Sequence, residues 1–258
     1  MNKKMQLAVL ATLTGVSIIA ASSAMAAERF STCAGVTRAA FEAAANTAAT
    51  ETDGFGFGLP MWATLADPTG RICYVYSTKH GTANTGASSG NQAWLGSRVI
   101  SAQKANTANA FSLNNLAIST GAVYVAVQPG GSLYGLQHSN PVDASKAYDG
   151  NPALFGTASD PLTGKNIGGV NVFGGGVALY NASHVKTGAV GASGDTSCRD
   201  HAFAYRLRLA LGLTGQPNDD GLKLVATPAA LFQQPACGVK DPTPSTAIGS
   251  ASDFGVRP

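Results

Sequence analysis

The sequence has few charged residues and no cluster of one sign. Only 12% of its 258 residues are charged, and its 17 basic residues include Lys3 and Lys4, which leaves 15 basic against 14 acidic residues elsewhere. No basic stripe runs along the chain. The electrostatic footprint of a nucleic-acid-binding protein is therefore missing, and we expect no nucleic acid as a partner.

Strong catalytic and metal-binding signatures are also missing. No Cys-x-x-Cys pair and no nearby Cys/His spacing indicates a zinc site. The segment Gly191-Ala192-Ser193-Gly194 does not have the spacing of a Gly-x-Ser-x-Gly nucleophile elbow. The glycines near Gly168 and Gly174 fit turns better than a dinucleotide fingerprint. We therefore assign no catalytic residue from the sequence, and the metal ligands are unknown.

One enzyme signature is present in the wrong geometry. Ser101-x-x-Lys104, Ser112-x-Asn114 and Lys186-Thr187-Gly188 occur in the order used by serine β-lactamases and penicillin-binding proteins. Ser101 and Ser112, however, would lie on one helix, roughly 16 Å apart along its axis. The second motif could not fold back over the first, so we reject a serine penicillin-recognising enzyme.

No long apolar run follows residue 26, but the first 26 residues have the pattern of a secretory signal peptide. Lys3 and Lys4 precede a mostly apolar run at residues 7–20, and Ala24-Met25-Ala26 offers small residues to a signal peptidase. The run is shorter than the roughly 20 residues of a membrane span, although an N-terminal anchor is the alternative. We expect a periplasmic or secreted chain that begins near Ala27 and has no membrane span.

Four cysteines remain after such processing, and in an exported chain they favour two disulfides. Three pairings are possible. The cysteines fall into two well-separated pairs along the chain, which favours Cys33–Cys73 and Cys198–Cys237. A metal site is the alternative use of these residues.

The pattern of apolar residues and turns predicts an α+β sandwich with helices around an antiparallel five-stranded sheet. Asp67-Pro68-Thr69-Gly70 has the composition of a type I turn and predicts a hairpin. A long irregular stretch at 116–165 is expected to cover a site or an interface. The expected domain spans 27–215, and residues 216–258 form a proline-rich, extended C-terminal tail. The expected helices are 31–51, about 95–113 and 197–213, and the expected strands are 61–66, 71–78, 168–173, 177–181 and 185–192.

Three motifs in order resemble the GlcG/HbpS-type haem-binding protein family. Residues 97–108 resemble the family's KA-x-TA helix, and residues 168–172 resemble its GG-hydrophobic-P-hydrophobic strand, with Asn171 in place of the usual proline. Residues 187–194 resemble its GA-hydrophobic-G-hydrophobic-SGG strand and turn. Asp200 follows where the family has an acidic residue at the start of the last helix. The resemblance covers about residues 31–213.

This resemblance implies a profilin-like sandwich that assembles into homo-oligomers and binds haem. Some members are linked to haem degradation, or to redox and iron sensing. The chain is thus expected to be an exported protein that binds haem or a related tetrapyrrole for storage, sensing or transfer. Two alternatives stay open: a haem-degrading or other small-molecule enzyme that uses the same pocket, and a non-catalytic oligomeric interaction module.

Haem requires an apolar slot, an axial ligand for the iron and cations for its two propionates. The histidine candidates are His80 and His138 in loops and His201 in the first turn of the last helix, whereas His184 is better explained as a solvated turn residue. Ligation by Tyr or Thr, or no protein ligand, also stays open. The best-placed cations are Arg98, Arg199, Arg206 and Arg208, because a guanidinium suits a carboxylate well. The aromatic residues that could line the slot are Tyr124, Tyr134 and Phe155.

Overall fold

The computed structural model describes residues 33–50, 56–78, 91–239 and 247–248, all within Cys33–Pro258. The expected signal peptide at 1–26 and His80 lie outside the described residues. Among the residues that are described, no helix has the length and apolar character needed to cross a membrane.

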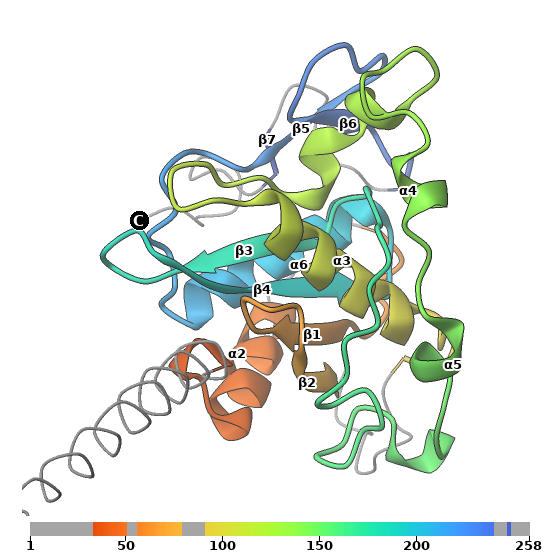
Figure 1. Cartoon of the computed structure of the whole chain (residues 1–258), viewed down its shortest axis with the longest axis vertical. Helices are drawn as coiled ribbons and strands as arrows, with labels where there is room; N and C mark the ends of the chain where they lie inside the picture. The colour runs from red at the N-terminus through yellow and green to blue at the C-terminus, as the bar shows by residue number, and fades with distance from the viewer. Residues whose placement is uncertain (1–32, 51–55, 79–90, 240–246, 249–258) are drawn as a thin grey trace, which may run out of the picture. The chain divides into compact units, whose positions relative to one another are not determined.

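A four-stranded antiparallel sheet forms the centre of the domain (Figure 1). Its strands are β1 (Trp62–Ala66), β2 (Ile72–Ser77), β3 (Gly176–Tyr180) and β4 (Lys186–Ser193), in the order β2-β1-β4-β3. The expected hairpin joins β1 to β2. Asp67 closes its turn, because its Oδ1 accepts hydrogen bonds from the backbone N–H groups of Thr69 at 2.9 Å and Arg71 at 3.1 Å.

The predicted fifth strand at 168–173 is wrong. Gly168 and Gly169 have φ values of +63° and +84°, which are left-handed rather than extended conformations. The segment contributes only an isolated bridge between Gly168 and Val142. The backbone of this segment forms hydrogen bonds with side chains instead. For example, the N–H of Asn171 donates to Thr107 Oγ1 at 2.9 Å.

Helices cover both faces of this sheet. Strand side chains alternate, so that Ala63 and Leu65 pack with α2 (Arg38–Thr50) and α6 (Ser197–Ala210), whereas Trp62 packs on the opposite face. On that opposite face, α3 (Ser97–Phe111) crosses β1, β3 and β4. The predicted arrangement of helices around an antiparallel sheet is therefore confirmed, with one strand fewer.

The sequence lets α3 lie unusually close to the sheet. A Cβ atom added at Gly191 in β4 would stand 1.9 Å from the carbonyl oxygen of Ser101 and 2.4 Å from the backbone nitrogen of Ala105. Ser101 itself is buried, and its hydroxyl lies 2.7 Å from Thr64 Oγ1 in β1. Small residues on both elements therefore set the position of α3, from which Lys104 extends.

The long stretch after α3 contains short helical turns and is fixed to α3. These turns are η2 (Thr120–Val123), η3 (Val125–Val127), α4 (Leu136–Ser139), α5 (Ala144–Ala147) and η4 (Pro152–Leu154). Arg98 of α3 makes a buried bidentate ion pair with Asp160, and its guanidinium lies 3.6 Å from the centre of the Phe155 ring. Arg98 therefore holds the irregular stretch against the core.

The C-terminal extension, residues 216–258, differs from the extended tail that the sequence predicts. Its described part forms a second sheet of β5 (Leu222–Val225), β6 (Gln233–Pro235) and β7 (Ala247–Ile248), in the order β6-β5-β7. Strand β5 pairs parallel with β6 and antiparallel with β7. Leu222 and Leu224 are fully buried, so this part of the extension packs as a structural element.

Two disulfides join these parts in the favoured pairing. Cys33–Cys73 links η1 (Cys33–Gly35) to β2, and Cys198–Cys237 links the first turn of α6 to the residues after β6. The second disulfide covalently attaches the extension to the domain.

Candidate functional site

A pocket of about 450 Å³ lies where the first turns of α3 and α6 meet the end of β4. This first pocket has a size typical of small-molecule sites. Its apolar wall consists of Trp94, Ile100 and Phe173, and its charged groups are Lys104, Asp195 and Asp200. The other lining residues are small or uncharged: Gly96, Ser97, Asn171, Ser193 and Ser197.

The aromatic wall of the first pocket is open to solvent. Trp94 is 41% exposed and Phe173 is 47% exposed, which is high for side chains of this size. The ring of Phe57 lies edge-on to Trp94, with 5.7 Å between the ring centres, and is itself 58% exposed. The pocket therefore presents an apolar, solvent-accessible surface suited to a flat ligand.

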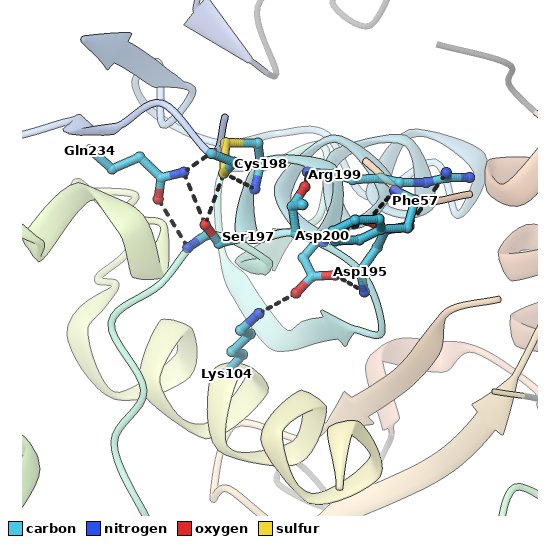
Figure 2. Close-up of a disulfide and its surroundings, with 11 residues drawn as sticks. Phe57, Lys104, Asp195, Ser197, Cys198, Arg199, Asp200 and Gln234 are labelled. Atoms are coloured by element: carbon cyan, nitrogen blue, oxygen red, sulfur yellow. Dashed lines mark hydrogen bonds and ion pairs between the residues drawn. A yellow bond between two sulfur atoms is a disulfide. The ribbon is translucent and has the colours of Figure 1, made fainter. Parts of the chain in front are cut away.

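A buried ion pair forms the floor of the first pocket. Lys104 Nζ of α3 lies 2.7 Å from Asp200 Oδ2 of α6, and both side chains are almost completely buried (Figure 2). Gly175 permits this contact, because a Cβ there would stand 3.0 Å from Lys104 Nζ and 2.9 Å from Asp200 Cβ. Burial raises the pKa of Asp200 to about 6, although the charge of Lys104 opposes the rise.

Asp195 holds the loop that carries Phe57. Its carboxylate accepts hydrogen bonds from the backbone N–H groups of Phe57 at 2.8 Å and Leu59 at 2.9 Å. It also lies 3.5 Å from the guanidinium of Arg199. The next residue, Thr196, caps α6 by accepting a hydrogen bond from the N–H of Arg199. These contacts fix the rim of the pocket relative to the start of α6.

A second pocket, of about 370 Å³, adjoins the first and shares Phe173 and Ser197 with it. Tyr124 and Thr196 contribute to its lining. The C-terminal extension supplies the rest of its wall, with Gln234, Pro235, Ala236 and Cys237. The extension is thus part of the site.

The profile of the HbpS-like haem-degrading protein family matches residues 37–207, which is about two thirds of the chain. The chain belongs to this family. The resemblance derived from the helix at 97–108 and the strand at 187–194 is thereby confirmed. No curated protein matches the chain significantly.

Two solved structures resemble this HbpS-like chain. The crystal structure of Klebsiella pneumoniae protein ORFY is 23% identical, with a TM-score of 0.43, and the match covers 69% of this chain and 90% of that one. The crystal structure of a PduOC:heme complex is 20% identical, with a TM-score of 0.44, and the match covers 69% of this chain and 93% of that one.

None of the histidines that the structure describes lines either pocket of the HbpS-like domain. His138 is exposed in α4, and His184 lies in the turn before β4, where its Nδ1 is 2.7 Å from the carbonyl oxygen of Gly215. His201 is completely buried in α6, one turn after Ser197. Across the described part of the chain, no group of three His, Cys, Asp or Glu side chains could hold a metal ion.

The predicted propionate-binding arginines are spread over the domain. Arg98 pairs with Asp160, Arg206 donates to the carbonyl oxygen of Ala48 at 3.2 Å, and Arg208 pairs with Asp220 at 2.6 and 2.7 Å. Arg199 lies 3.5 Å from Asp195, which lines the first pocket. The structure therefore places only Arg199 of these four next to the site.

Sequence reasoning missed most of the pocket residues. Trp94 and Phe173 carry the apolar wall, yet neither lies in one of the three family motifs. Lys104 and Asp200 do lie at positions of the family resemblance, and two opposite charges at those positions are the signal that could have indicated a buried pair. Of the aromatic residues expected to line a slot, Tyr124 lines the second pocket, Phe155 stacks on Arg98 and Tyr134 is exposed.

Proposed function

We propose that this protein binds haem in the first pocket, with Trp94 and Phe173 against the macrocycle. The observation that carries the proposal is this pair of exposed aromatic side chains in one pocket of a chain from a haem-degrading protein family. Burying a side chain such as Phe173 against a ligand contributes about 1.5–3 kcal/mol. A flat apolar ligand can therefore gain substantial affinity from this wall alone.

The donor set supports apolar contact with weak axial help as the mode of binding. Bound haem would supply an iron that can accept a protein ligand, and the described lining of both pockets contains no histidine. Lys104 is already paired with Asp200. Asn171, Ser193 and Ser197 offer uncharged polar groups, and Arg199 is the nearest predicted cation.

We also propose that the protein is exported and serves haem storage, sensing or transfer. Two disulfides are compatible with an oxidising compartment, and the sequence of residues 1–26 supports a leader peptide. A profilin-like arrangement and a homo-oligomer remain part of the proposal, supported by the family resemblance.

Haem titration of two pocket variants and a control variant tests the location of the haem-binding site. Phe173→Ala and Trp94→Ala should each weaken haem binding roughly ten- to a hundredfold, because each removes one apolar wall. Tyr148→Ala is the matched control, since Tyr148 is 63% exposed and lines neither pocket. The dissociation constant is read from the shift of the Soret band.

If the three substitutions weaken haem binding equally, haem binds outside the first pocket. A Soret band that stays like that of free haem would contradict binding altogether and would favour the interaction module.

Haem degradation is the second candidate, and the description of the family favours it. Asp200, with its pKa raised to about 6, is a buried acid that can exchange a proton near neutral pH at the pocket floor. Adding ascorbate or peroxide to the haem-loaded protein tests this candidate. Loss of the Soret band faster than for free haem supports degradation, and a stable band supports storage or transfer.

A further inference from the structure

The C-terminal extension forms a wall of the site that lies beyond the part of the chain matched by the family profile, residues 37–207. The central residue of this wall is Gln234, which is 1% exposed. Its Oε1 accepts a hydrogen bond from the N–H of Gly174 at 3.2 Å, next to Phe173 of the first pocket. The position of Gln234 therefore affects both pockets.

The disulfide Cys198–Cys237, here called the extension disulfide, fastens this wall to α6 (Figure 2). Cys198 is completely buried, whereas Cys237 is half-buried and lines the second pocket. A reagent that enters the second pocket can therefore approach the sulfur of Cys237, while Cys198 is shielded.

Hydrogen-bond donors lie beside both sulfurs of the extension disulfide, and Cys198 also packs with Ala202 and Leu224 in an apolar cluster. Cys198 is the second residue of α6, where the free N–H groups and the helix dipole stabilise negative charge. The N–H of Cys198 lies 3.1 Å from Cys237 Sγ, and Ser197 Oγ lies 3.3 Å from the same sulfur. The amide nitrogen of Gln234 lies 3.6 Å from Cys198 Sγ. The start of α6 and the Gln234 amide lie beside Cys198, and a sulfur whose thiolate is stabilised is the better leaving group in thiol–disulfide exchange.

Cys33–Cys73 has different surroundings. Cys73 is 4% exposed in β2 and packs with Phe41 and Met61 in the core between the sheet and the helices α2 and α6, where Cys33 also contacts it. Each disulfide joins a buried cysteine to a half-buried one, and each buried cysteine packs in an apolar cluster. The extension disulfide differs in that Cys237 lines a pocket and Cys198 lies in the first turn of α6.

We propose that the extension disulfide is a substrate for a dithiol reductant, such as an exported thiol–disulfide exchange protein, and that its reduction opens the site. A thiolate of the reductant attacks Cys237 Sγ, the bond between the two sulfurs breaks, and Cys198 leaves as a thiolate that takes up a proton. The second thiol of the reductant then attacks the mixed disulfide. Cys237 is released as a thiol, and the reductant becomes a disulfide, so two electrons and two protons pass to this protein.

Reduction would loosen one part of the extension and leave another in place. Leu222 and Leu224 of β5 are buried, and we expect β5 to stay packed after reduction. The residues from β6 to Cys237 lose their covalent link, so that the contacts of Cys237 Sγ with Ser197 and of Gln234 with Gly174 can break, while β6 stays paired with β5. The second pocket would therefore widen on the side of Phe173, and haem would leave faster. This last consequence rests on the proposed function.

The order in which the two disulfides are reduced tests the proposed exchange reaction, and this experiment needs no haem. The purified protein is titrated with dithiothreitol at constant pH, free thiols are alkylated, and mass spectrometry identifies the labelled cysteines. Cys198 and Cys237 should be labelled at about tenfold lower dithiothreitol than Cys33 and Cys73, a difference equivalent to about 30 mV. Simultaneous labelling of all four cysteines, or earlier labelling of Cys33 and Cys73, overturns the proposal.

The rate of haem transfer to excess apomyoglobin tests whether loss of the extension disulfide opens the site. The double variant C198S/C237S should release haem about tenfold faster than the wild type, the change expected when contacts worth one to two hydrogen bonds are lost. The matched control is C33S/C73S, which should release haem at the wild-type rate. If selective reduction occurs but haem does not bind, the proposed function fails and the reducible disulfide stands. If haem binds and both variants release it at the wild-type rate, the opening is refuted.

Discussion

At the scale of single residues, partners far apart in the sequence decide what a charged side chain does. Lys104 and Asp200 are separated by 96 positions, and Arg98 and Asp160 by 62. The sequence identifies Arg98 as a cation available for a propionate, whereas the structure uses it in a buried ion pair. A residue type and its local pattern predict the presence of a charge, but the partner depends on how distant segments pack.

The Lys104–Asp200 pair gives the protein a pH dependence of known sign. The pKa of Asp200 is raised from 3.8 to about 6, chiefly by burial, so the folded protein binds this proton more tightly than the unfolded chain does. Asp200 therefore stabilises the fold most below pH about 4, and this stability is lost as the pH rises through about 6. Relative to Asp200→Asn, the wild type should lose up to about 3 kcal/mol across that window. Urea denaturation at several pH values measures the difference.

Asp149→Asn is the control for this pH dependence. Asp149 is exposed, and its hydrogen bond to Lys165 lowers the pKa of its carboxyl group. The wild type should gain a little stability relative to this variant as the pH rises, which is the opposite sign. A difference between wild type and Asp200→Asn that does not change with pH would contradict the assigned burial of Asp200.

At the scale of elements, local signals predicted the regular parts well. The hairpin turn at Asp67, the capped start of α6 and the two strands β3 and β4 lie within a few residues of their expected positions. Segments whose conformation depends on distant contacts were missed. Residues 168–173 have the composition of a strand, yet Gly168 and Gly169 adopt left-handed conformations that a strand does not have.

The close packing of α3 on β4 yields a prediction at this scale. Gly191→Ala should destabilise the fold by about 1–3 kcal/mol or more, because its Cβ would overlap the backbone of Ser101. Gly96→Ala is the matched control, since Gly96 has open space around its Cβ position. The control should be neutral or slightly stabilising. Equal urea midpoints for the two variants would show that α3 can move away from the sheet at little cost.

At the scale of the whole molecule, the site depends on parts that no local pattern connects. Family motifs predicted α3 and β4 beneath the first pocket and located Asp200. The apolar wall comes from Trp94 before α3, Ile100 of α3 and Phe173 before β3, and the C-terminal extension lines the second pocket. The cysteine pairing was predictable from spacing, but the position of Cys237 at a pocket was not.

The location of iron in crystals of the haem-loaded protein tests the central claim most directly. An anomalous difference map collected at the iron absorption edge shows where the metal lies relative to the described side chains. The proposal predicts a peak in the first pocket, between the side chains of Trp94 and Phe173. A peak beside His138 or His184, or no peak in crystals of protein saturated with haem, would contradict it.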